Sequence, residues 1–273
     1  MNILPMFFKI LVITLFFGSS LFQPLIGAGE PPSGILLARA RELQAENREK
    51  DALSVYEQVL RAEPNHFSAL LASAYLHIRQ GWLTLDEAEE KVHYQMALNH
   101  AEQALRQKPD DYQANLLNCV AKAKCIDYAF QGDQVRIVRE LEQKLNALIA
   151  SNHLDPDSIY ILSWLNFKIG GLSVFKKFMV AVLFGGLPKD FSQEKALRLM
   201  ERSIELKPDY TVYHYDLGHF HQRMGRIEKA RVIFKKVASM PPHKPEDMVY
   251  KEFAECRLRG LSGDPTRNAY KCR

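Results

Sequence analysis

The chain has 273 residues, of which 47% are hydrophobic and 25% charged, as is typical of a folded soluble protein. Its 36 basic and 32 acidic residues leave a formal charge of +4 at pH 7, with no block of five or more like charges. This small, scattered excess argues against nucleic acid as a partner, and the length allows one large domain or two small ones.

The first 28 residues predict an export signal. Residues 6–22 are nearly all apolar, with Lys9 the only formally charged side chain, and small residues follow at 27–29. A short basic start, an apolar run and a small-residue exit are typical of a secretory signal, so we expect cleavage after Ala28 and a periplasmic or extracellular location. An uncleaved membrane anchor is the alternative, because about 20 apolar residues can span a bilayer.

Five prolines divide the rest of the chain. Pro64, Pro109, Pro156, Pro208 and Pro242 are separated by 45, 47, 52 and 34 residues, and each closes one helical pattern before the next begins. Proline cannot continue a helix, because it lacks the backbone N–H and its ring clashes with the preceding turn. The near-regular spacing of these prolines predicts an all-α fold, an α-α superhelix of about five helical hairpins with insertions.

After a linker at 29–34, the repeat region is expected to run from 35 to 261. Its first half should contain three hairpins, with helices over 35–47, 51–62, 67–80, 84–108, 112–130 and 133–148. Gly81 is expected to stop the third helix and to open a turn. A capping box that starts at Thr84 should begin the fourth helix, and Asp133 should cap the sixth.

The second half contains an apolar insertion over residues 170–189. Asp155 and Pro156 suit the cap and first position of the preceding helix, which Gly170 and Gly171 end. We expect Leu172–Phe184 within the insertion to pack against the solenoid. Contact with a membrane surface or a partner is the alternative.

Three further helices are predicted after the insertion, over 192–206, 212–224 and 226–239. A last helix over 245–261 could cover the apolar end of the stack, which solenoids require for solubility. Residues 262–273 are expected to form a loose tail.

The last hairpin resembles a tetratricopeptide repeat (TPR), a 34-residue helix–turn–helix unit. The residues that carry the resemblance are Leu217, Gly218, Gly225, Ala230, Phe234 and Pro242. Small residues at 218 and 230 suit a close helix crossing, and glycine at 225 suits the turn. Phe234 would fill the space between hairpins.

Part of this pattern recurs elsewhere in the chain. The spacing of four and then eight residues that joins Ala230, Phe234 and Pro242 is repeated in three places, at Ala52, Tyr56 and Pro64, at Ala97, Ala101 and Pro109, and at Ala196, Met200 and Pro208. Four instances of one spacing indicate a repeat architecture.

A narrower resemblance involves the C-terminal part. Residues 183–188, with the sequence LFGGLP, precede a helix bearing Glu and Ala and then the last repeat. This order is similar to the C-terminal part of the regulator of microtubule dynamics family and covers less than a third of the chain. The resemblance implies TPR-like repeats behind an N-terminal hydrophobic segment.

In stacked TPRs the first helix of each hairpin lines an inner groove, so exposed positions there are candidate partner-binding residues. They are Tyr75, Arg79, Tyr160, Trp164, Phe167, Tyr215, His219 and Arg223. Aromatic residues and arginine anchor many interfaces because they bury much area at modest entropic cost. The alternative for each aromatic residue is a place in the core.

These residues predict a groove for a protein or peptide, without a cofactor. Some TPRs grip a partner's C-terminal carboxylate with Lys, Arg and Asn. The comparable positions here include Leu71, Leu116 and Val120, which argues against that clamp.

The cysteines leave the disulfide pattern open, since four cysteines allow three pairings. Cys256 and Cys272 are candidates for a bridge in an exported compartment. Cys119 and Cys125 share a predicted helix, where six residues of rise hold them about 9 Å apart, too far for a bridge. Free or buried thiols are the alternative.

No metal site or enzyme is predicted. His214, His219 and His221 lack the spacing of three or four residues that metal sites on helices prefer. The chain has no GxSxG, no HExxH and no glycine-rich phosphate loop. An enzyme that carries no known motif is the alternative.

Overall fold

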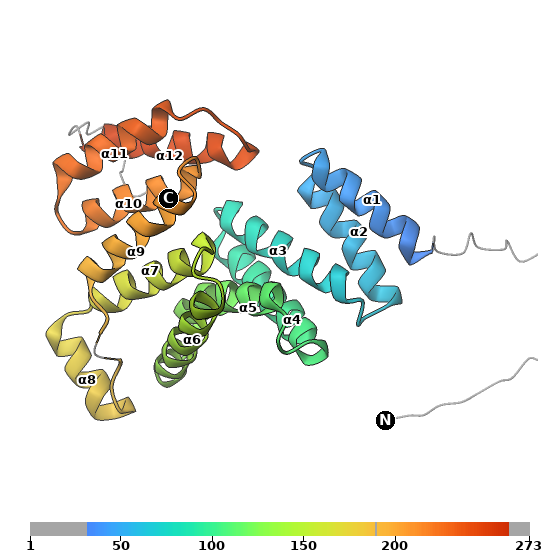
Figure 1. Ribbon diagram of the computed structural model, residues 1–273, viewed down its shortest axis with the longest axis horizontal. Helices are drawn as coiled ribbons and strands as arrows, with labels where there is room; N and C mark the ends of the chain where they lie inside the picture. The colour runs from blue at the N-terminus through green and yellow to red at the C-terminus, as the bar shows by residue number, and fades with distance from the viewer. Residues whose placement is uncertain (1–31, 189, 262–273) are drawn as a thin grey trace, which may run out of the picture. The chain divides into compact units, whose positions relative to one another are not determined.

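The structure is a computed structural model that describes residues 32–188 and 190–261 (Figure 1). The predicted signal and the C-terminal tail lie outside this part. All described helices belong to one compact unit. Within the described ranges the chain forms twelve α-helices and a short 3-10 helix, with no strand. The predicted all-α fold is therefore confirmed.

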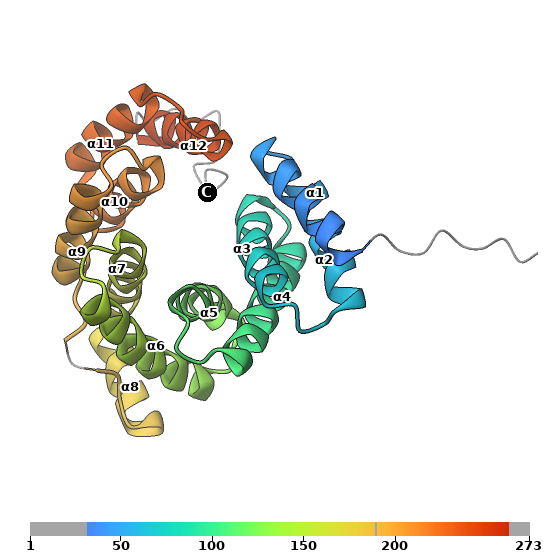
Figure 2. The same ribbon diagram turned by 45° about the vertical axis from the view of Figure 1, so that its right-hand side comes forward.

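Ten of the described helices pair into five hairpins. The pairs are α1 (Ser33–Ala45) with α2 (Glu49–Ala62), α3 (Phe67–Leu83) with α4 (Glu87–Gln107), α5 (Tyr112–Cys125) with α6 (Gln131–Ser151), α7 (Pro156–Gly170) with α9 (Gln193–Leu206), and α10 (Thr211–Arg223) with α11 (Ile227–Ser239). Between α5 and α6 lies η1 (Ile126–Tyr128). Each hairpin packs on the next, and the row curves within this unit (Figure 2). Finally, α12 (Pro245–Leu261) packs on α10 and α11.

Side-chain caps begin several of these helices where the sequence predicts a start. The carboxylate of Asp155 accepts a hydrogen bond from the Ser158 N–H at 2.8 Å, directly before Pro156. Ser192 accepts from the Lys195 N–H at 3.1 Å. Such bonds satisfy N–H groups that have no partner inside the helix.

The last hairpin shows why its small residues are needed. A Cβ atom added at Gly218 would lie 2.8 Å from the ring of Phe234, so α10 and α11 cross too closely for a side chain there. Gly225 has φ of +74°, a left-handed turn that suits glycine. Phe234 and Ala230 are completely buried. The small alanines of the other repeats, Ala52, Ala97 and Ala196, are also completely buried, and Tyr56 is 3% exposed.

Gly81 does not end α3, contrary to the prediction. The helix continues to Leu83, and Gly81 is buried inside it. A Cβ at this position would lie 2.8 Å from the ring of Tyr94 in α4. Gly81 therefore allows α3 and α4 to cross closely, as Gly218 does for α10 and α11. The expected turn comes after Leu83.

Two predicted caps are also wrong. The N-cap of α4 is Asp86, which accepts from the N–H groups of Ala88 and Glu89, and Thr84 instead accepts from the Asp86 N–H. In α6 the N-cap is Phe130, so Asp133 lies in the first turn. Both helices still have acidic side chains in the first turn, which interact favourably with the positive end of the helix dipole.

The apolar insertion forms α8 (Val174–Phe184), which has no buried residue. Val174, Phe178 and Val182 are 86%, 61% and 64% exposed. Figure 1 shows α8 beside α6, outside the paired helices, and the two are in contact. The segment therefore packs against the solenoid through α6, as expected, but it leaves most of its apolar side chains exposed.

Two hydrogen bonds help to hold α8 in place. Lys177 donates a hydrogen bond to the Gly170 carbonyl at 3.0 Å, and Arg139 donates to the Phe184 carbonyl at 3.2 Å. None of the helices in the described part combines the length and the apolar character that crossing a bilayer requires.

Candidate partner-binding groove

A cavity of about 240 Å³ is lined by residues from α3, α5, α7, α10 and α12. A second cavity, of about 250 Å³, adjoins it and shares the lining residues Val120, Lys124, Tyr160 and Ile161. We call these two neighbouring cavities the inner groove. Its walls come mainly from the first helices of successive hairpins, as expected for a TPR-like stack.

The structure brings four of the predicted contact residues together in the inner groove. Tyr75, Arg79 and Tyr160 line the first cavity, and Tyr75 is 39% exposed. Trp164 lines the second. Trp164 also borders a separate hollow of about 690 Å³, together with His219 and Arg223. The predicted contact residues therefore divide between two surfaces.

Phe167 and Tyr215 lie in the core, the alternative that the sequence left open. Phe167 is 8% exposed and stacks on Phe220 with ring centroids 3.9 Å apart, although it touches the edge of the hollow. Tyr215 is 3% exposed, and its ring contacts Phe234 and Tyr250. Their burial leaves little surface for a partner.

A buried carboxylate fixes two side chains of the groove wall. Asp216, which is 7% exposed, accepts hydrogen bonds from the Tyr160 hydroxyl at 2.6 Å and from the Trp164 indole N–H at 2.9 Å. Burial raises the pKa of Asp216, although these hydrogen bonds act in the opposite direction. Asp216 thus orients Tyr160 and Trp164 before any partner arrives.

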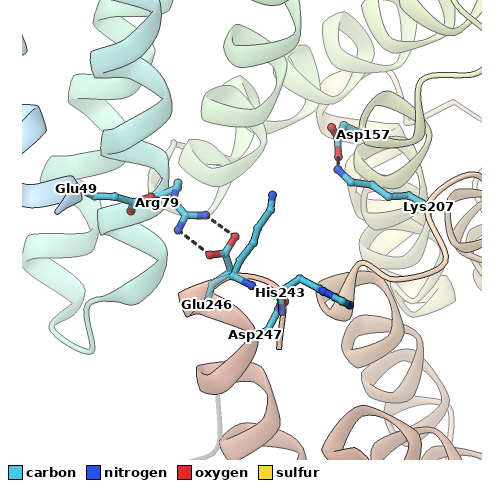
Figure 3. A network of polar contacts seen from close by, with 8 residues as sticks. Glu49, Arg79, Asp157, Lys207, His243, Glu246 and Asp247 are labelled. Carbon is cyan, nitrogen blue, oxygen red and sulfur yellow. Dashed lines mark hydrogen bonds and ion pairs between the residues drawn. The ribbon is translucent and has the colours of Figure 1, made fainter. Parts of the chain in front are cut away.

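A second polar network joins α3 to α12 (Figure 3). The Arg79 guanidinium donates two hydrogen bonds to the Glu246 carboxylate, at 2.8 and 3.0 Å. Its Nε lies 2.6 Å from a carboxylate oxygen of Glu49. Burial raises the pKa of Glu246, but the hydrogen bonds from Arg79, a backbone hydrogen bond and the charges of Arg79 and Lys244 together hold this pKa below its ordinary value. Arg79 is therefore fully engaged within the protein.

Aromatic packing strengthens the same junction. The ring of Trp82 stacks on Tyr250 with centroids 4.2 Å apart, and Phe253 lies at its edge. We call the Arg79–Glu246 pair and the Trp82–Tyr250 stack the clasp. The clasp joins residues far apart in the sequence, so no local sequence pattern could have revealed it.

The sequence did not single out several residues of the inner groove. Lys124, Lys207, Lys244 and Asp157 line its first cavity, along with Tyr210. The sequence Lys207-Pro208-Asp209 marked only the end of a helix. Such residues could have been found only by knowing that the starts of α10 and α12 face α3.

The histidines near Asp216 do not converge. His214 lies with Nε2 2.7 Å from the Pro208 carbonyl oxygen, whereas His219 packs against Trp164. Burial, Arg257 and Arg223 lower the pKa of His219 to about 4, so it is neutral at pH 7. Across the described ranges, no group of three or more His, Cys, Asp or Glu side chains is arranged to hold a metal ion. Cys272 lies outside the described residues, so its pairing with Cys256 stays a prediction.

Three similar solved structures have the same type of helical repeat fold. TTC0263, a TPR protein of Thermus thermophilus, has a TM-score of 0.57 and 16% identity, covering 82% of this chain and 98% of that one. A TPR protein of Parabacteroides merdae has a TM-score of 0.57 and 13% identity, covering 87% and 75%. A monomeric IFIT1 mutant, in a structure with m7Gppp-AAAA, has a TM-score of 0.50 and 16% identity, covering 88% and 57%.

These likenesses and the five hairpins define a TPR-like helical repeat protein, as the sequence predicted. The family is more specific. The sequence profile described as regulator of microtubule dynamics protein 1-3 matches residues 36–262, so the chain belongs to this family. The narrower resemblance is thereby confirmed and extends over nearly the whole described unit. A search of curated proteins finds no match to the sequence.

Proposed function

We propose that this protein is a non-catalytic scaffold that holds a segment of a partner protein in its inner groove. The observation that carries the proposal is the convergence of side chains from six helices on one groove, with Tyr75 and Tyr160 in its walls. Tyrosine buries a large area while losing few rotamers, which favours binding. Asp216 orients Tyr160 in advance and so lowers the entropy lost on binding.

The state of the acidic groups supports a binding role rather than catalysis. A general acid must be able to donate a proton to the substrate, and a general base must be able to accept one from it. Glu246 is engaged by Arg79, and Asp216 is buried beneath Tyr160 and Trp164. Both carboxylates thus serve contacts within the protein.

A protein segment is a better candidate than nucleic acid. The IFIT1 structure includes a capped oligonucleotide, but at 16% identity that likeness concerns the fold alone. The first cavity of the inner groove contains Asp157 and Glu246 as well as basic residues, so its walls are of mixed charge. Proteins that follow a nucleic-acid backbone present a continuous basic surface instead.

Photo-cross-linking in the native host tests the groove. With p-benzoylphenylalanine in place of Tyr75, we expect a covalent adduct of higher mass after irradiation. Val232, which is 67% exposed on α11 and lines neither cavity, provides the matched control position. Equal adducts from both positions, or adducts only from 232, would count against the groove.

We further propose that the protein is exported and cleaved after Ala28, with an uncleaved membrane anchor as the alternative. The apolar run at 6–22 and the small residues at 27–29 support this proposal. The intact mass of the protein purified from its own host distinguishes the two. A chain that starts near Gly29 supports cleavage, whereas an intact N-terminal segment supports the anchor.

Contact of α8 with a membrane surface is a second candidate function. Val174, Phe175 and Phe178 are 86%, 70% and 61% exposed, and α8 contains two lysines and no acidic residue. Exposed apolar side chains beside lysines suit the interface of a bilayer with anionic lipids.

Quenching by brominated lipids tests this contact whether or not the N-terminus is an anchor. We expect vesicles of brominated phosphatidylcholine and phosphatidylglycerol to quench the added emission of Phe178→Trp relative to the unsubstituted protein. The added emission of the control Val232→Trp should remain. Similar quenching of the two variants would exclude a specific contact through α8.

A further inference from the structure

We infer that the segment held in the inner groove is extended and acidic, and that an Asp or Glu side chain within it bridges Lys207 and Lys244. This inference rests on the proposed function. Lys207 and Lys244 approach the same aromatic ring, with their Nζ atoms 4.1 and 5.4 Å from the centroid of Tyr210. Both lysines and Tyr210 line the first cavity of the inner groove.

Two ammonium groups at one ring repel each other unless an anion lies between them. Tyr210 offsets part of this repulsion through cation–π contacts. A carboxylate that reaches both lysines would remove the remainder and gain charge-assisted hydrogen bonds. The pair is therefore suited to an acidic group that comes from outside the chain.

The carboxylates already present neutralise this pair only in part, although the charge of Lys244 helps to lower the pKa of Glu246. Glu246 is committed to Arg79 through two hydrogen bonds. Asp157 accepts from the Tyr213 hydroxyl and lies 3.8 Å from Lys207, near the limit of an ion pair. Lys244 forms no ion pair with any carboxylate of the described residues.

The charge of the whole cavity points in the same direction. Its walls contain four cationic side chains, from Arg79, Lys124, Lys207 and Lys244, and only two carboxylates. Positive charge is therefore in excess on the walls of this cavity. The low dielectric constant of the surrounding protein strengthens the effect of this charge on a bound segment. Charge complementarity therefore favours an acidic partner over a basic one.

The walls of the groove favour an extended segment. Side chains from five helices line the first cavity, and the clasp joins α3 to α12 beside it. An extended chain directs successive side chains to opposite sides and can contact several walls, whereas an amphipathic helix binds through one face. An extended chain with one side chain directed at the lysines therefore suits this cavity better than a helix.

The surroundings of the lysine pair favour an internal acidic residue over a chain terminus. Lys207, Tyr210 and Lys244 line not only the inner groove but also a hollow of about 350 Å³ beside His243 and Asp247. Two hollows therefore border the pair, so that a partner chain has space beyond the residue that meets the lysines. A partner that ended there would leave one of these spaces unused.

A library of random heptapeptides, displayed on phage with both ends of each peptide joined to flanking sequence, tests the inference. The full chain is the bait, alongside Lys207→Glu/Lys244→Glu. Lys235→Glu/Lys236→Glu on α11 is the matched control, because both lysines are exposed and the change in charge is the same. Lys207→Gln/Lys244→Gln serves as a milder variant, and circular dichroism melting checks that each bait is folded.

We expect Asp and Glu to be enriched in peptides selected by the unsubstituted and control baits. The Lys207→Glu/Lys244→Glu bait should select Lys and Arg instead. Selected acidic peptides should bind the Lys207→Gln/Lys244→Gln variant about tenfold more weakly, because they lose charge-assisted hydrogen bonds.

The other outcomes separate this inference from the proposed function. Peptides that are not acidic, or that bind equally after both lysine changes, overturn the inference while the groove remains a binding site. A failure of the folded, unsubstituted bait to enrich any peptide contradicts both proposals.

Discussion

At the scale of single residues, two glycines set how closely neighbouring helices approach. Gly81 faces Tyr94 and Gly218 faces Phe234, and in each case an added Cβ would lie 2.8 Å from the ring. A glycine inside a helix lowers stability by roughly 1 kcal/mol relative to alanine. In both hairpins this cost is offset by packing an aromatic ring directly onto the backbone of the opposite helix.

Replacing Gly81 should therefore destabilise the protein although alanine favours helices. We expect Gly81→Ala to lower the free energy of unfolding by about 1–3 kcal/mol, because Tyr94 must move. Gly34→Ala, at a position with open space, is the matched control and should be neutral or slightly stabilising. Urea unfolding followed by circular dichroism measures both. Equal effects would contradict the close crossing at Gly81.

His77 should make stability depend on pH. It is 5% exposed on α3, with Nδ1 2.9 Å from Nδ1 of His93, and the ring of His100 is nearby. Burial, then His100 and His93, lower the pKa of His77 to about 3. Glu57 lies 3.2 Å from its Nε2 but is 37% exposed, so solvent screens its opposing effect.

The folded protein therefore binds a proton at His77 less readily than the unfolded chain, whose histidines titrate near pH 6.5. Stability is complete above pH 6.5 and should fall as the pH drops from 6.5 towards 3, by about 1.4 kcal/mol per pH unit from this group. His77→Gln should flatten the dependence measured by urea unfolding. His153→Gln, a change at the surface, is the control. Parallel slopes for His77→Gln and the unsubstituted protein would exclude this role.

At the scale of elements, α3 and α12 depend on each other. The side chains of Arg79 and Glu246 are 16% and 5% exposed, and Glu49 adds α2 to the same junction. A buried ion pair adds little net stability over a well-packed apolar pair, but removing one partner leaves the other charge buried without compensation. The clasp is therefore a sensitive point of the fold.

We expect Arg79→Ala to destabilise the protein by about 3 kcal/mol, because Glu246 loses its partner in a buried site. Hydrogen exchange should speed up at the start of α12. Arg136→Ala, which removes ion pairs at a side chain that is 61% exposed, should cost less than about 1 kcal/mol and is the control. Unchanged exchange in α12 of Arg79→Ala would show that the clasp does not hold this helix.

At the scale of the whole repeat unit, stability comes from neighbours that cover one another. Tyr250 and Ala254 of α12 are buried against the last hairpin, in the same cluster as Tyr215 and Phe234. A repeat with an uncovered end exposes such a cluster to water. The last helix therefore matters for both solubility and closure of the groove.

Ending the chain after His243 should uncover this cluster. We expect faster hydrogen exchange in α10 and α11 than in α4 and α5, because protection in a repeat protein depends mainly on adjacent repeats. The size distribution by light scattering should shift towards aggregates. Equal loss of protection in all hairpins would indicate a single cooperative unit instead.

Much of this architecture could be read along the chain. Helix positions follow from apolar spacing and from prolines such as Pro156, because both act over a few residues. The wrong prediction at Gly81 also came from local sequence, because a glycine near the end of a helical pattern resembles a helix stop. Its place inside α3 is explained only by the close approach of the Tyr94 ring. The candidate site was partly predictable, since Tyr75 and Tyr160 do line the groove.

The sequence by itself determined the helices, the repeat pattern and the family resemblance, because these depend on spacings within one hairpin. Only the tertiary structure decided that Tyr215 is buried, that Arg79 meets Glu246, and that Lys207 and Lys244 share one ring. Such contacts depend on how successive hairpins are rotated against each other. That rotation is the sum of many packing contacts and leaves no short-range pattern in the chain.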